Sequence, residues 1–227
     1  MPQRVLSAQR RHEKIRLALR PFFSLIAHAL MRVEVGGTEN IPPRGPLLIA
    51  FNHIGHLDPF LVYLTMPQPP EIIGLAEAWH IPVIGFLVRL YGGIPVQRDQ
   101  VDRAVVEAAL AILHSNHMLA LAPEARISPT GQLSEGRTGA AYLACKAGAP
   151  VLPAAVTGTE RLGRELKRWR RPRVSITYGA PMSSAPLPSN AVERKRVLRE
   201  ETDQIMRAIA AMLPEEYRGV YRVTSDG

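Results

Sequence analysis

The sequence has a single cysteine, Cys145, among its 227 residues, so the chain cannot form an internal disulfide. Such scarcity fits a protein that folds in a reducing compartment. Cys145 lies inside an apolar helical pattern, which favours packing over chemistry. Stability must come from a hydrophobic core, and a chain with 46% hydrophobic residues can build one as a single domain.

Long hydrophobic runs are also missing, and no stretch approaches the roughly 20 apolar residues that span a bilayer. The N-terminal region lacks the pattern of a signal peptide. Its basic run is long, no small-residue cleavage site follows, and Pro21 and His28 interrupt its apolar stretch. We therefore expect a protein that is soluble or lies on a membrane surface. No internal repeat or low-complexity segment is present.

Acidic residues are outnumbered, and the net charge of +8 is unevenly distributed. Residues 1–33 carry a net charge of +6 and residues 160–173 a net charge of +5, which leaves −3 for the remainder. Two basic segments on a mildly acidic body indicate an anionic partner surface. The second segment includes Trp169 and would suit nucleic acid phosphates as readily as lipid headgroups.

The N-terminal segment has the periodicity of an amphipathic helix. Its apolar stripe consists of Ile15, Leu19, Phe22, Phe23, Ile26, Leu30 and Val33. Arg16 and Arg20 are expected to turn toward the polar side, and Pro21 to divide or kink the helix. One interpretation is an ordinary helix that packs on the domain, and the other is a helix in the membrane interface.

The alternation of strand and helix patterns predicts an α/β fold. We expect strands near 33–35, 46–51, 71–75, 93–96, 118–121, 151–156 and 174–178, and helices near 59–66, 101–114, 137–146 and 190–213. Pro153 within its strand indicates an edge position or a site that needs no ladder bond. The prediction is one domain, residues 34–227, with a largely parallel central sheet flanked by helices, preceded by the amphipathic segment 1–33.

Polar residues follow several of these strands. His53 and Asp58 follow the strand at 46–51, Arg98 follows the one at 93–96, and Glu124 and Arg126 follow the one at 118–121. The carboxyl ends of parallel strands meet at one edge of a sheet, where ligands bind. The sequence therefore predicts that these side chains share one rim.

His53 and Asp58 allow three interpretations. Asp58 before Pro59 suits a helix N-cap. His53, His56 and Asp58 are also suitable metal ligands, although no other histidine has the spacing to complete a site. The third interpretation is a general base, His53, oriented by Asp58. The chain lacks a G-x-S-x-G motif and any cysteine in a nucleophile setting, so the attacking alcohol would belong to the substrate.

Four sequence blocks carry a family resemblance. They are Asn52-His53 with Asp58 (N-H-x-x-x-x-D), and the segments 93–98 (GIPVQR), 123–128 (PEARIS) and 151–156 (VLPAAV). In order and spacing this chain resembles the glycerolipid acyltransferases typified by bacterial 1-acylglycerol-3-phosphate acyltransferase, over roughly residues 33–180. The family is membrane-associated, which favours the interfacial interpretation of the N-terminal helix.

The resemblance implies an O-acyltransferase that moves a fatty acyl group from acyl-CoA or an acyl-carrier protein to a lysophospholipid, without a metal or other cofactor. It implies His53 and Asp58 as the catalytic pair. It also implies a substrate-binding set of Asn52, Gly93, Arg98, Glu124, Ala125 and Arg126, with the two arginines on the acceptor phosphate. From spacing alone, Arg98 equally suits a surface ion pair with Asp99. The expected location is the cytoplasmic face of the cell membrane, as a peripheral or monotopic protein.

One position departs from the family pattern, because Ala125 stands where the family usually has glycine. If that position needs a positive φ, alanine costs roughly 1 kcal/mol or shifts the loop. This departure concerns the acceptor and not the type of reaction, and the alternative acceptors are another lysolipid or a glycolipid. More distant alternatives are a metal-dependent hydrolase and a nucleic-acid-binding protein.

Overall fold

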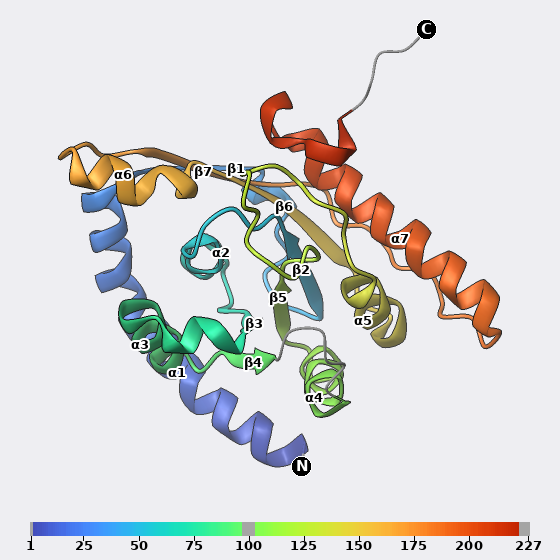
Figure 1. Cartoon of the computed structure of the whole chain (residues 1–227). Coiled ribbons are helices and arrows are strands. Elements are labelled where there is room, and N and C mark those ends of the chain that lie inside the picture. The colour runs from blue at the N-terminus through green and yellow to red at the C-terminus, as the bar shows by residue number, and fades with distance from the viewer. Residues whose placement is uncertain (1, 97–102, 223–227) are drawn as a thin grey trace, which may run out of the picture.

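One mixed sheet with helices on both faces forms the body of the molecule (Figure 1). The structure is a computed structural model that describes residues 2–96 and 103–222. The predicted fold class, a largely parallel sheet flanked by helices and preceded by an N-terminal helix, is confirmed.

Five strands run in one direction and two in the other. The strands are β1 (Arg32–Gly36), β2 (Leu47–Phe51), β3 (Glu71–Leu75), β4 (Ile94–Val96), β5 (Met118–Leu121), β6 (Val151–Thr157) and β7 (Arg173–Tyr178). Their order is β1-β7-β6-β2-β5-β3-β4, and each neighbouring pair is parallel except β6 and β7. The carboxyl ends of β2 to β6 therefore share one edge, as predicted.

The helices cover both faces of this sheet. They are α1 (Pro2–Leu30), α2 (Asp58–Thr65), α3 (Pro82–Tyr91), α4 (Arg103–His114), α5 (Gly139–Ala147), α6 (Leu162–Lys167) and α7 (Ala191–Met212). Five short 3₁₀ turns complete the described chain, at Thr38–Asn40, Ala76–His80, Thr159–Arg161, Glu215–Tyr217 and Gly219–Tyr221. The sequence pattern did not predict α3 or α6. The segment of α3 is almost continuously apolar and that of α6 is basic, so neither shows a clear apolar stripe.

The central strand β2 supplies side chains to two separate cores. Leu48 and Ala50 pack with residues of α4, α5 and α7, whereas Leu47, Ile49 and Phe51 pack with residues of α1, α2 and α6. All five residues of β2 are buried. Because both faces of the strand are covered, its sequence is a continuous apolar run rather than an alternating one.

Helix α1 corrects two expectations. It is one continuous helix that contains Pro21, so a division into two helices at this residue is wrong, although Figure 1 shows that the helix changes direction along its length. The expectation that Arg16 faces solvent is also wrong, because Arg16 is only 2% exposed. Its guanidinium donates to both carboxylate oxygens of Glu71, at 2.6 and 2.8 Å, and this pairing makes burial of the charge tolerable.

Pro153 lies in β6, an interior strand, so the expected edge position is wrong. The second alternative, a site without a ladder bond, explains its place. Pairing of β6 with β7 begins at Ala154, and the carbonyl of Pro153 only accepts a bond from Gly179, just beyond β7. Proline has no N–H to donate, and position 153 lies just outside the β6–β7 ladder, so that ladder loses no hydrogen bond there.

Candidate active site

His53 and Asp58 form a hydrogen-bonded pair just beyond the end of β2. Nδ1 of His53 lies 2.8 Å from Oδ2 of Asp58. The His53 side chain is 20% exposed, whereas that of Asp58 is fully buried. Since Nδ1 is engaged by the carboxylate, Nε2 is the nitrogen left for a substrate.

Asp58 is held by backbone and hydroxyl donors around it. Its Oδ2 also accepts the backbone N–H groups of Ile54 (2.7 Å) and Gly55 (2.8 Å), and its Oδ1 accepts the hydroxyl of Thr159. These amides precede the helix, and Leu57 occupies the N-cap position. The N-cap interpretation of Asp58 is therefore wrong, because the carboxylate points back toward the histidine loop instead of capping α2.

Glu124 joins the loop after β2 to the loop after β5. Its Oε1 accepts the backbone N–H of His53 (3.1 Å), and its Oε2 accepts the N–H and hydroxyl of Ser134 (2.8 Å each). Burial raises the pKa of this carboxyl, and the bonds from Ser134 and His53 partly oppose the rise. The observed contacts of Glu124 fix the histidine backbone.

Asn52 is likewise engaged within the protein. Its amide donates to the carbonyl of Val156 (2.9 Å) and accepts the N–H of the same residue (2.6 Å), and the residue is only 1% exposed. The side chain thus joins β2 to β6 and holds the start of the histidine loop. The contacts observed for Asn52 are thus to the protein itself, and its expected place among the substrate contacts stays a prediction.

His53 lines a largely apolar cavity of about 670 Å³. Its aromatic wall includes Phe23, Phe60, Tyr63, Trp79 and Tyr91. Trp79, Ile81, Ile84, Leu87 and Val88, from an apolar segment of the sequence, also contribute side chains to the lining. The volume and the apolar lining are those of a site for an apolar small molecule.

Basic side chains line the same cavity as His53. Arg126 and Arg137 both line the cavity and are exposed. Gly93 and Ala125, from the expected substrate-binding set, also line it. Ala125 has a φ of +53°, so the loop does require the left-handed conformation that glycine adopts at low cost. Arg98 lies outside the described residues. The lining, as far as the chain is described, contains no serine, threonine or cysteine.

Two contributors were not predicted. Thr159 follows β6, so the strand-end rule that identified His53 and Glu124 would also have found it. Arg137 precedes α5, where its sequence position indicates only a helix start. Both are far from His53 in sequence, and only the packing of the loops brings them to the site.

Within 2–96 and 103–222, no three His, Cys, Asp or Glu side chains are grouped so that they could hold a metal ion. Over the same residues, no helix is both long enough and apolar enough to cross a membrane.

Curated relatives are similar to this chain over somewhat more than half of its length. A "1-acyl-sn-glycerol-3-phosphate acyltransferase" of Pseudomonas aeruginosa is 30% identical over 128 residues, which cover 55% of this chain and 49% of the relative. A protein of the same name from Borreliella burgdorferi is 25% identical over 131 residues, covering 57% and 52%. A "1-acyl-sn-glycerol-3-phosphate acyltransferase BAT2, chloroplastic" of Brassica napus is 27% identical over 144 residues, covering 61% and 41%. The chain thus spans about half the length of these relatives.

A solved structure agrees with the fold. The crystal structure of the 1-acyl-sn-glycerophosphate (LPA) acyltransferase PlsC from Thermotoga maritima matches with a TM-score of 0.61 over 88% of this chain and 86% of that one, at 21% identity. At this identity the likeness concerns the fold alone. The family model described as Acyltransferase matches residues 32–157, more than half of the chain, including β2, the histidine loop, Glu124 and β6. This protein therefore belongs to the acyltransferase family.

Proposed function

We propose that this protein moves a fatty acyl group from an acyl thioester to the hydroxyl of a lysophospholipid, with 1-acylglycerol-3-phosphate as acceptor and phosphatidic acid as product. The observation that carries the proposal is the His53–Asp58 pair in the wall of an apolar cavity whose described lining contains no serine, threonine or cysteine. Family membership and the names of the relatives support the same reaction.

His53 acts as the general base in this proposal. Its Nε2 takes the proton of the acceptor hydroxyl as that oxygen attacks the thioester carbonyl. The ester C–O bond forms, the C–S bond breaks, and the imidazolium returns its proton to the departing thiolate. Asp58 holds Nδ1–H in place and stabilises the cation, as its 2.8 Å contact allows. Holding both substrates in attack geometry supplies much of the acceleration.

The apolar and the basic parts of the cavity lining are proposed to bind different parts of the lipid. An acyl chain fits the apolar interior, and the guanidinium of Arg126 takes the acceptor phosphate. The exposed Arg137 beside it is a further candidate for that phosphate. Arg98 keeps this role from the family resemblance. Glu124 positions the His53 backbone, and Gly93 and Ala125 let the backbone approach the ligand closely. The donor is acyl-CoA or an acyl-carrier protein, and the reaction needs no metal.

The N-terminal segment 1–33 is proposed to contact an anionic membrane surface, which would place the protein on the cytoplasmic face of the cell membrane. Phe22 and Leu25 on α1 are 59% and 70% exposed. Large apolar side chains exposed to water, within a segment of net charge +6, suit a helix that lies in the interface between membrane and water.

An assay with purified protein, lysophosphatidic acid and labelled acyl-CoA tests the reaction, with the lipids separated afterwards. We expect labelled phosphatidic acid, at least a hundredfold less with His53→Ala, and a smaller but clear loss with Asp58→Asn. Wild-type turnover by His53→Ala would remove the assignment. A panel of other lysolipids and glycolipids with the same donor identifies the acceptor, and faster turnover of one of these would replace the acceptor but keep the reaction.

A further inference from the structure

The turn between α6 and β7 presents a tryptophan to solvent. Trp169 is 98% exposed, although tryptophan is among the side chains that gain most from burial. Its φ is +57°, a conformation that a bulky residue adopts only at a cost and that glycine adopts freely. Backbone bonds from Trp169 to Leu166 and from Arg170 to Glu165 close the turn around it. This left-handed turn ends α6, but its geometry does not require a tryptophan, and the described residues around the ring do not bury it.

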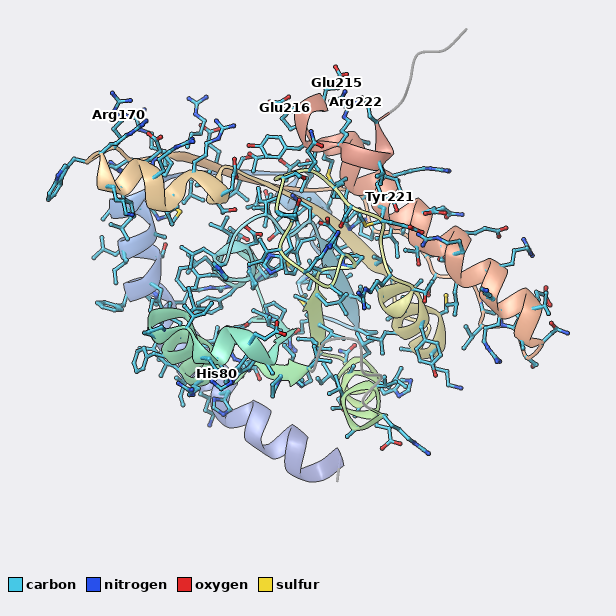
Figure 2. The ribbon with its side chains drawn as sticks, viewed as in Figure 1. His80, Arg170, Glu215, Glu216, Tyr221 and Arg222 are labelled. Carbon is cyan, nitrogen blue, oxygen red and sulfur yellow. The ribbon has the colours of Figure 1, made fainter. Side chains whose placement is uncertain are left out.

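The residues around Trp169 are basic and exposed. Lys167, Arg168, Arg170 and Arg171 all face solvent. Arg168 lies 3.9 Å from Glu165, whereas no ion pair to another described residue is found for Lys167 or Arg170. Figure 2 shows Arg170 at the outer side of the turn, pointing away from the body of the molecule. The turn therefore combines one aromatic side chain with several uncompensated positive charges.

This turn is fastened to the end of α1 that carries exposed apolar side chains. The guanidinium of Arg171 donates to the backbone carbonyls of His28 and Met31, at the end of α1 and just beyond it. On the preceding turns of α1, Phe22, Leu25 and Leu30 are 59%, 70% and 41% exposed. The apolar part of α1 and the basic turn thus lie next to each other, which Figure 1 also shows for α1 and α6.

We propose that the α6–β7 turn, residues 167–171, is a second membrane contact that seats Trp169 in the interface of an anionic bilayer beside α1. Tryptophan concentrates at the boundary between headgroups and acyl chains, because its ring is apolar and its N–H is polar. Arginine and lysine at the same depth attract anionic headgroups. The inference rests on the membrane contact proposed for α1, and it adds a second point that fixes the orientation of the molecule.

Tryptophan fluorescence tests the contact directly, because the chain has only two tryptophans. In a Trp79→Phe background, vesicles of equal parts phosphatidylcholine and phosphatidylglycerol should shift the Trp169 emission to the blue. Brominated lipids should quench this emission. As a matched control, Val192 of α7 is 81% exposed, and Val192→Trp in a Trp79→Phe, Trp169→Phe background should show neither effect.

Sedimentation with the same vesicles gives the strength of the contact. Arg170→Ala should weaken binding about fivefold, and Trp169→Gly roughly tenfold. Trp169→Gly should also raise the midpoint of thermal unfolding, because glycine relieves the positive φ. Weaker binding by a more stable variant cannot result from misfolding.

Three outcomes would overturn the proposal. The first is vesicle binding without a blue shift of the Trp169 emission. The second is equal vesicle binding by Trp169→Gly and wild type. The third is a loss of affinity for duplex DNA in Trp169→Gly and Arg170→Ala that equals their loss for vesicles, which would assign the turn to nucleic acid. The binding arms are run with His53→Ala, and acyl transfer is measured separately with detergent-dispersed substrate. Failure of the membrane contact is thereby distinguished from failure of the proposed reaction.

Discussion

The position of the buried Asp58 carboxylate is fixed by the hydrogen-bond donors around it. It accepts bonds from the His53 ring, two backbone amides and the Thr159 hydroxyl. A carboxylate without water needs such donors, since burying an unpaired charge is costly. Gly55 is part of this arrangement, because a Cβ there would lie 2.7 Å from Oγ1 of Thr159. Thr159 therefore holds Asp58, and through it the His53 ring, in place.

Removal of the Thr159 hydroxyl tests this positioning role. We expect Thr159→Val to lower kcat roughly tenfold with little change in KM, because Asp58 loses the donor on Oδ1 and with it part of its fixed orientation. The unpaired oxygen should also cost about 1–3 kcal/mol of unfolding free energy. Kinetics and urea denaturation measure the two effects. Thr159→Ser keeps the hydroxyl and serves as the control, and a kcat for Thr159→Val equal to that of Thr159→Ser would refute the role.

Ala125 carries a local strain that glycine would release. Ala125→Gly should raise the free energy of unfolding by about 0.5–1 kcal/mol, because relief of the positive φ exceeds the entropy that glycine adds to the unfolded chain. Ala122→Gly is the matched control in the same loop, and it should lower stability. Chemical denaturation measures both variants, and a loss of stability in both would show that the position is unstrained.

At the scale of elements, α1 is bound to the sheet by polar contacts as well as apolar ones. Beyond its pair with Glu71, Arg16 donates through Nε to the carbonyl of Tyr91 (2.7 Å), and its own carbonyl accepts the Tyr63 hydroxyl (2.5 Å). The guanidinium also stacks over the Tyr91 ring, 4.2 Å from its centroid. These contacts hold α1 against β3 and α3 as one wall of the cavity.

Removing only the carboxylate of the Arg16–Glu71 pair should destabilise the packing of α1 on the sheet. Glu71→Ala leaves the Arg16 guanidinium buried without its carboxylate and should cost about 3–5 kcal/mol of unfolding free energy. The double variant Arg16→Met, Glu71→Leu replaces the pair with apolar side chains and should recover most of the loss. Denaturation of the two variants and wild type measures this, and equal losses in the single and double variants would count against the pair as the cause.

At the scale of the whole molecule, Glu124 links stability to pH. Burial raises the pKa of its carboxyl in the folded protein above the unfolded value of about 4.3. The folded state therefore binds the proton more tightly, and its stability falls as the pH rises from the unfolded pKa through the folded one.

Comparison with Glu124→Ala isolates this contribution. The variant lacks the bonds to His53 and Ser134 and should be less stable at every pH. The difference in unfolding free energy between wild type and variant should be largest near pH 4 and narrow as the pH rises. Urea denaturation across this range measures it. A difference that widens instead would mean that the hydrogen bonds outweigh burial.

Local patterns in the sequence determined most elements and the position of the chemistry. The apolar run 46–51 identified β2, the periodicity at 101–114 identified α4, and the residues after each run marked the sheet edge. The pairing of His53 with Asp58 was also predictable, because the two residues are only five positions apart, in the loop after β2 and at the first position of α2. Such features depend on neighbours within a few positions, which the sequence displays directly.

Other features were decided only by tertiary packing. They are the burial of Arg16, the interior position of Pro153, the hydrogen bond from Thr159 to Asp58, the hydrogen bond from Asn52 to Val156, and the presence of Arg137 in the cavity lining. Each depends on a partner far away in the chain. Periodicity reports which face of an element is apolar, but not which distant charge or backbone group meets a polar side chain. These polar partners meet only when the strands and loops assemble, and they fix the orientation of the His53 imidazole beside the apolar cavity.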